Sequence, residues 1–174
     1  MTNEVLRGYW ASVHCNDNFI CVRTNSGYRG GTDVDPKGVQ HFIATDASDE
    51  DIGLAVVDAL AHSRWVLSAP REGSTYPSEV EFDSDLTFKK GMERHAIWVE
   101  LLMERYSYKT KRALFKGMKN CYLEKKYGVI TFKPTHHEKL EAWSGTGEDV
   151  VIPDTSAVIE IGAALRLAFS RCTG

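Results

Sequence analysis

The chain has 174 residues and a mass of 19.5 kDa, and its 43% hydrophobic and 26% charged content excludes disordered and fibrous classes. This length favours one domain spanning 1–174. The start, MTNEVLRGYW, lacks a basic segment followed by an apolar run, and no stretch approaches the ~18 apolar residues of a membrane span. We therefore expect neither a signal peptide nor a membrane helix, and a cytoplasmic location.

The net charge of −3 is unevenly distributed along the chain. Residues 33–85 contain twelve acidic and three basic side chains, whereas residues 86–133 contain twelve basic and four acidic ones. Such asymmetry indicates either a charged partner or two solvated faces that attract each other in the fold. The four cysteines are scattered without a CxxC pair, so free thiols are expected, and neither a metal nor a cofactor is predicted.

The first part of the chain predicts β-structure. Residues 9–15 and 19–24 flank the turn-forming Asn-Asp-Asn and predict a hairpin. Residues 25–38 are rich in glycine and aspartate and predict a long loop, and residues 39–45 predict a short strand.

The next segments predict two helices separated by a loop. Ser48, with Asp51 three residues later, is close to a capping box at the start of a helix over 48–64. Residues 68–88 predict a loop with at most a short strand at 80–82, and apolar residues at helical spacing predict a second helix over about 90–106.

The last third predicts a hairpin and a helix. Residues 121–126 and 129–133 form the expected arms around a Tyr127-Gly128 turn, with Pro134 as the end of the hairpin, and 155–171 is a helix. With a further strand before this helix, the element order predicts a mixed α/β (α+β) fold: a largely antiparallel sheet with about three packed helices.

Two of the predicted helices contain a similar Ile-Gly step, at Gly53 and at Gly162. Glycine inside a helix costs about 1 kcal/mol relative to alanine. Close packing of the helix backbone against the sheet would explain why that cost is accepted.

The segment THHEKLEAWSG, residues 135–145, is the most chemically suggestive. Thr135 and Glu138 fit a capping box, which would give the two histidines between them a structural role. The alternative is a small metal-assisted hydrolase that uses His136, His137 and Glu138, although the HExxH spacing of zinc proteases is absent.

A basic run with interleaved aromatic residues raises a third hypothesis, an RNA-binding module. Its bases are Lys109, Lys111, Arg112, Lys116 and Lys119. The acidic character of the whole chain weakens phosphate binding, so no nucleic-acid partner is expected.

Three blocks of sequence resemble a known family. They are YSYKTKRALFKGMKNCYLEKKYGVITFKPTHHEKLEAWSG (106–145), VVIPDTSAVIEIGAALRLAFSRC (150–172) and, more loosely, YRGGTDVDP (28–36) through IGLAVVDALAHSR. Together they resemble the CdiI-type immunity proteins of bacterial contact-dependent growth inhibition systems. This resemblance implies a cytoplasmic, non-enzymatic antidote that neutralises a cognate CdiA-type C-terminal toxin domain, often a nuclease, in a one-to-one complex.

The resemblance and the charge asymmetry together suggest a binding surface. The active site of a nuclease is usually basic because it must hold phosphates, and an acidic surface accelerates association with it. The candidate partner-binding residues are the acids of the 33–85 stretch that lie outside the first helix: Asp33, Asp35, Glu79, Glu81, Asp83 and Asp85.

Overall fold

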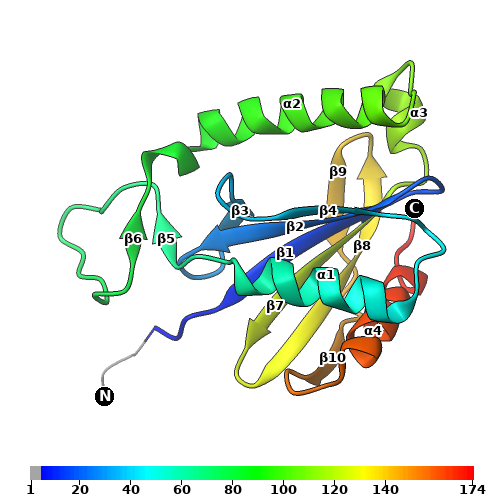
Figure 1. The fold of residues 1–174 in the computed structure, drawn as a ribbon. Coiled ribbons are helices and arrows are strands. Elements are labelled where there is room, and N and C mark those ends of the chain that lie inside the picture. The colour runs from blue at the N-terminus through cyan, green and yellow to red at the C-terminus, as the bar shows by residue number, and fades with distance from the viewer. Residues whose placement is uncertain (1–4) are drawn as a thin grey trace.

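An antiparallel sheet built from both ends of the chain forms the centre of the fold (Figure 1). The computed structural model describes residues 5–174. Residues 1–4 lie outside the described residues; they begin the N-terminal segment in which no signal peptide is expected. The order in the sheet is β10-β8-β7-β1-β2-β3, with β4 also paired to β2 and β9 to β8. The strands are β1 Tyr9–Cys15, β2 Ile20–Gly27, β3 Thr32–Val34, β4 Gln40–Ile43, β7 Lys119–Lys126, β8 Val129–Lys139, β9 Ala142–Gly145 and β10 Val150–Pro153.

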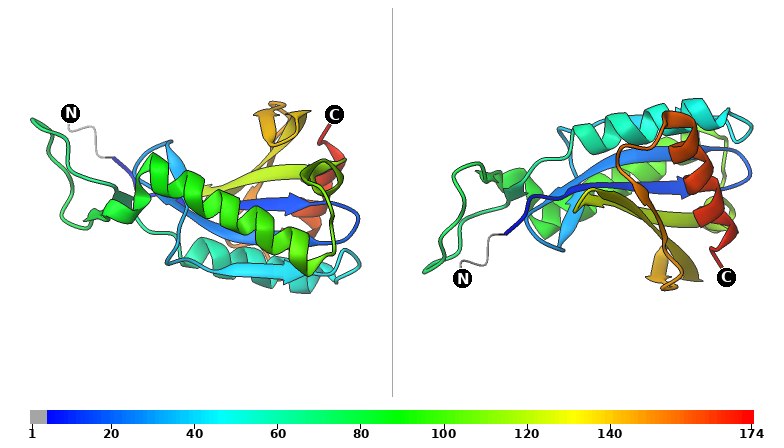
Figure 2. Two further views of the ribbon diagram at one scale, coloured as in Figure 1. Left: turned by 90° about the horizontal axis from the view of Figure 1, so that it is seen from above. Right: turned by 90° about the horizontal axis from the view of Figure 1, so that it is seen from below.

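Helices cover both faces of this sheet (Figure 2). Within residues 5–174 the α-helices are α1 Asp49–Ala61, α2 Phe88–Arg105, the short α3 Lys111–Phe115 and α4 Val158–Ser170. One face packs against α1 and α4, and the other lies under α2 and α3. None of the helices in the described part of the chain is long and apolar enough to cross a bilayer.

A small arm projects from one end of the sheet (Figure 1). It contains β5 Val66–Leu67 and β6 Glu81–Phe82, which pair in parallel, and a 3₁₀ turn at Ser84–Leu86. The expected short strand within the 68–88 loop is therefore confirmed.

The two faces of the sheet differ in chemistry because strand residues alternate in direction. On β2, Ile20 and Val22 point into the large apolar core beneath α1 and α4. Phe19 and Cys21 point to the other side, where they join a smaller cluster around Trp98 and Leu102 of α2. Hydrophobic burial therefore holds α1 and α4 over the whole sheet, but holds α2 mainly by its C-terminal half.

The glycines of the repeated Ile-Gly step lie where α1 and α4 cross. A Cβ atom added to Gly53 would overlap the backbone carbonyl of Val158, and one added to Gly162 would overlap that of Asp49. The expectation of close backbone packing is confirmed, but its partner is the other helix rather than the sheet. The residues beside the glycines, Ile52 and Ile161, are buried in the same core.

The sequence-based prediction was wrong at Pro134. We expected this proline to end the hairpin and Thr135 to cap a helix, whereas β8 continues to Lys139 and forms a second hairpin with β9. β8 pairs with β7 along one edge; along its other edge it pairs first with β10 and then with β9, and Pro134 lies at the change between these two partners. A proline is tolerated at such a boundary because its missing N–H group interrupts the ladder least there.

The other predicted elements are confirmed with small shifts. Ser48 caps α1 by accepting a hydrogen bond from the backbone N–H of Asp51 at 3.1 Å, and Tyr127 and Gly128 form the β7–β8 turn with positive φ. The sequence analysis missed β3, which lies in the expected 25–38 loop, and the five-residue α3.

The glycine crossing gives the first prediction. Gly162→Ala should lower the free energy of unfolding by about 1–3 kcal/mol, because the added methyl group meets the backbone of α1 rather than a flexible side chain. Gly145→Ala is the matched control, since a Cβ there meets nothing within 4 Å. Urea unfolding of both variants measures the difference, and equal midpoints would contradict the packing argument.

Candidate functional site

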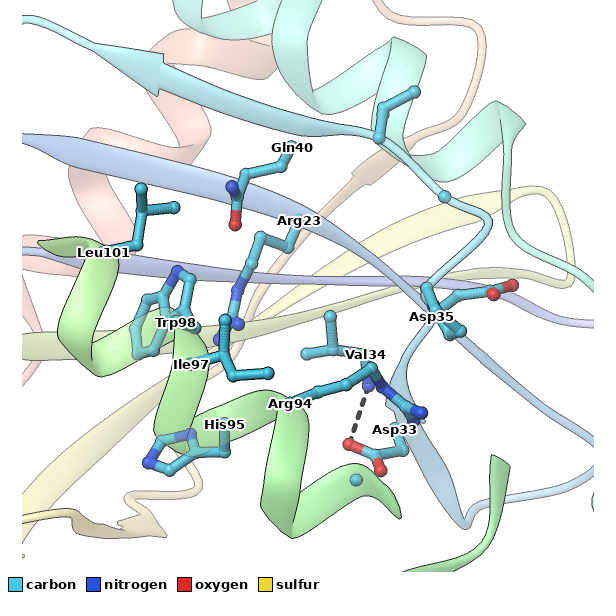
Figure 3. Close-up of a pocket in the computed structure, with 14 residues that line it drawn as sticks. Arg23, Asp33, Val34, Asp35, Gln40, Arg94, His95, Ile97, Trp98 and Leu101 are labelled. Carbon is cyan, nitrogen blue, oxygen red and sulfur yellow. Dashed lines mark hydrogen bonds between the residues drawn. The ribbon is translucent and has the colours of Figure 1, made fainter. Parts of the chain in front are cut away.

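A hollow of about 360 Å³ lies between α2 and the sheet (Figure 3). Its floor comes from β2, β3 and β4, and its roof comes from α2. Trp98, Val99 and Leu102 anchor the C-terminal half of α2, whereas Phe88 and Met92 at its start are exposed. The hollow therefore exists because α2 is packed at one end only.

The face of the sheet beneath α2 carries polar side chains on its central strands, in contrast to the apolar face beneath α1 and α4. Strand alternation places Ser12 and His14 of β1 on this side, next to Arg23 and Asn25 of β2. Ser12 donates a hydrogen bond of 2.8 Å to the side chain of Asn25, so this pair satisfies itself. The neighbouring His14 and Arg23 do not have such partners.

Within residues 5–174, Arg23 is a buried cation with no carboxylate oxygen within 4.0 Å of its guanidinium group. The residue is 6% exposed, its Nε atom has no hydrogen-bond partner, and its guanidinium lies 3.7 Å from the ring centre of Trp98. Burial lowers the pKa of Arg23 from its ordinary value to about 10, so the group stays charged at neutral pH. The stacking on Trp98 offsets part of the cost of burying this charge.

Arg94 brings a second cation to the same hollow from α2. Its Nη1 donates a hydrogen bond of 2.5 Å to the carbonyl oxygen of Asp85, while Nε and Nη2 are buried without a partner. Figure 3 shows Arg94 extending along the underside of α2 above Asp33 and Val34.

Within residues 5–174, every buried side-chain nitrogen or oxygen that lacks a hydrogen-bond partner belongs to the layer made up of this sheet face and α2. These atoms are His14 Nδ1, Arg23 Nε, Arg94 Nε and Nη2, Trp98 Nε1, and both polar atoms of the Asn120 amide. Buried polar groups are normally paired, since leaving one unpaired costs about 1–3 kcal/mol. This concentration marks the layer as a place where a further polar ligand would be stabilised.

His14 separates the hollow from the region under β9. Its ring lies 5.0 Å from that of Trp98 and 5.2 Å from that of Trp143. Burial and, secondarily, the charge of Arg23 hold the pKa of His14 well below its usual range, so the imidazole is neutral. A neutral ring here adds no positive charge to that of Arg23.

The structure separates the predicted acidic residues into two groups. Asp35 is fully buried and forms a two-pronged ion pair with Arg64, with nitrogen–oxygen distances of 2.7 and 2.8 Å. Arg64 also donates to Asp83 at 3.0 Å, and this side chain is 10% exposed. Both carboxylates thus tie the β5–β6 arm to the β2–β3 edge of the sheet.

The remaining four predicted acids are exposed: Asp33, Glu79, Glu81 and Asp85. Asp85 forms a surface ion pair with Lys90 at 2.8 Å. Asp33 lies at the rim of the hollow, where it accepts a hydrogen bond from the backbone N–H of Val34. These four residues still carry the prediction of an acidic binding surface, and Asp35 and Asp83 have an internal structural role.

The two histidines of the THHEKLEAWSG segment have structural partners. His136 Nδ1 lies 2.7 Å from the hydroxyl of Thr173, and His137 stacks on Trp143 with ring centres 4.9 Å apart. Glu138 accepts a hydrogen bond from Ser144 across the β8–β9 hairpin. The described residues contain no group of three or more His, Cys, Asp or Glu side chains placed to hold a metal, so this geometry does not favour the hydrolase alternative.

The five bases of the RNA-binding hypothesis are all exposed on and around α3. Their exposure agrees equally well with a solvated basic face, and the hypothesis stays a prediction.

Sequence analysis missed Arg23, Arg94 and Trp98 as a cluster. The one available signal is a charged residue that directly follows the apolar run Phe-Ile-Cys-Val in a predicted strand. Arg94 lies 71 positions later, and no pattern in the sequence indicates that a helix would bring it over this strand.

Comparison with known proteins decides the family. The profile of the CDI immunity protein family matches residues 9–172. The chain belongs to this family. It is 51% identical to the immunity protein CdiI-YPIII of Yersinia pseudotuberculosis serotype O:3 (strain YPIII), over 99% of each chain.

Solved structures of similar proteins agree with this CDI immunity fold. A chain of a CdiA-CT/CdiI toxin and immunity complex from Yersinia pseudotuberculosis matches with a TM-score of 0.93 and 49% identity, over 98% of this chain and 100% of that one. A protein of unknown function from Neisseria meningitidis matches with a TM-score of 0.81 and 34% identity, over 99% of both chains.

The Asp35–Arg64 ion pair generates a stability prediction. Asp35→Asn should lower the free energy of unfolding at neutral pH by about 3 kcal/mol, because the buried side of Arg64 loses its charged partner. Asp85→Asn is the control, since its exposed ion pair with Lys90 should contribute little. Equal losses in the two variants, measured by urea unfolding, would show that burial of the pair is unimportant.

The ion pairs around Arg64 also predict how the stability of the fold depends on pH. Burial acts to raise the pKa of Asp35, but hydrogen bonds from Arg64, Ser26 and the backbone of Lys37 outweigh it and hold the pKa below its ordinary value. A backbone hydrogen bond from Asp85, followed by that from Arg64, lowers the pKa of Asp83 to about 2. Both carboxylates therefore stabilise the fold above about pH 4, and this contribution is lost as the pH falls towards 2. Asp35→Asn should flatten the curve of stability against pH in that range.

Proposed function

We propose that this protein is an immunity protein that binds the C-terminal toxin domain of its own contact-dependent growth inhibition system and neutralises it in the cytoplasm. The observation that carries the proposal is the near full-length similarity to CdiI-YPIII, together with the match to a chain of a toxin and immunity complex. We further propose a one-to-one complex in which this chain acts by binding rather than by catalysis.

The proposed toxin is a nuclease whose basic active site faces the acidic side of this protein. Support comes from Glu79 and Glu81, which are exposed on and beside the β5–β6 arm, and from Asp33 at the rim of the hollow. Acidic groups on a projecting arm would steer a basic partner towards the sheet before close contact is made.

The direct test is calorimetry with the toxin domain encoded immediately upstream, purified separately. Tight one-to-one binding, with loss of nuclease activity in the mixture, is the expected result. His137→Ala should bind equally well, because His137 has a structural role against Trp143 and takes part in no proposed contact. Absence of binding at micromolar concentrations would refute the proposed function.

Association kinetics test the acidic surface separately. Glu79→Lys with Glu81→Lys should slow association with the toxin by roughly tenfold at low ionic strength, with a smaller effect at high salt. The matched control is Glu148→Lys with Asp149→Lys, which changes the net charge equally at an exposed loop next to β10. Identical association rates for the two double variants would remove electrostatic steering by the arm.

A further inference from the structure

The unpartnered donors in the hollow point to a specific recognition element. We propose that Arg23 and Arg94 bind the carboxylate of an Asp or Glu side chain that the toxin inserts between α2 and the sheet. This inference rests on the proposed function and adds to it the chemistry of one contact.

The two arginines supply unused hydrogen-bond donors. Arg23 offers its buried Nε, and Arg94 offers Nε and Nη2, which lie on one edge of its guanidinium group. That edge is the one that forms two parallel bonds to a carboxylate. The same geometry is seen within this protein, where Nε and Nη2 of Arg64 grip both oxygens of Asp35.

The charges that line the hollow also favour an anion. The floor and roof of the hollow bring together two guanidinium groups, whereas Asp35 is already neutralised by Arg64 and His14 is neutral. The remaining carboxylate is that of Asp33 at the rim, which has no ion pair within 4.0 Å in the described part of the chain. Two guanidinium groups and one carboxylate leave one uncompensated positive charge, which a single carboxylate would balance and a doubly charged phosphate would exceed.

The walls of the hollow favour a protein segment as the source of that anion. The walls around the arginines are mainly apolar and include Val34, Ile97 and Leu101, and Trp98 forms one side. Ile97 is 65% exposed and Leu101 is 40% exposed, so both are available to a partner that enters from the open edge. A protein segment with one acidic side chain flanked by apolar residues fits these walls better than a free ion does.

Both arginines are already held in place in the free protein. Stacking on Trp98 holds Arg23, and the bond from Nη1 to the carbonyl of Asp85 holds Arg94. Because these groups are already ordered and desolvated, an incoming carboxylate meets donors that have little further entropy to lose.

The experiment compares three single variants of this chain in calorimetry against the upstream toxin domain. Arg23→Gln and Arg94→Gln should each weaken binding by about tenfold or more, as expected for loss of a charged hydrogen bond. Arg105→Gln is the control, because Arg105 lies on the same helix and stacks on an aromatic ring, that of Phe42 at 4.3 Å, but does not line the hollow. Thermal unfolding of all variants separates a binding defect from a folding defect.

A second measurement identifies the partner group. Each exposed Asp and Glu of the toxin is changed to its amide, and the variants are titrated with wild-type protein and with the Arg94→Gln variant. One toxin position should lose affinity with wild-type protein and show no further loss with Arg94→Gln, as a double-mutant cycle requires for a direct contact.

The outcomes are distinguishable. If wild-type protein does not bind the toxin, the proposed function fails. If wild-type protein binds but Arg23→Gln and Arg94→Gln bind with unchanged affinity, the function stands and the carboxylate site is refuted. The site is equally refuted if both variants lose affinity but no acidic toxin residue couples to Arg94.

Discussion

The close contact between α1 and α4 is the constraint on which the rest of the fold depends. The helices approach so closely at Gly53 and Gly162 that backbone meets backbone, and their apolar residues then cover one whole face of the sheet. The core on that face is larger than the cluster around Trp98 on the opposite side, so it supplies most of the hydrophobic stabilisation of the fold. The opposite face is therefore free to remain polar and partly open.

This difference between the two faces of the sheet explains why the unpartnered polar atoms are concentrated on the side of α2. A polar layer with unsatisfied donors reduces stability, and a fold held by a single core could not easily accept it. Here the α1–α4 core and the ion pairs around Arg64 offset the cost. Sites that bind other molecules commonly depart from the packing rules in this way, at positions that the rest of the fold supports.

Sequence patterns predicted the scaffold well and the site poorly, for physical reasons. Alternating strands, the Ser48 cap and the spacing of apolar residues in the helices act over a few residues, so they can be identified locally. The role of Asp35 depends on Arg64, which lies 29 residues later in the sequence, and a charge count cannot distinguish a buried acid from an exposed one. The prediction at Pro134 was wrong for a related reason. Whether a strand can contain a proline depends on which strands lie beside it, and for β8 that is a property of the whole sheet.

The α1–α4 contact also has a consequence for the order of events during synthesis. The ribosome makes α1 well before α4, which begins at Val158, so until then the apolar face of α1 can pack only against strands of the sheet. The part of the main core that lies between the two helices can therefore close only after α4 has been made. A truncated or stalled product would contain most of the sheet and the whole hollow, yet it would lack the packing that holds them in place.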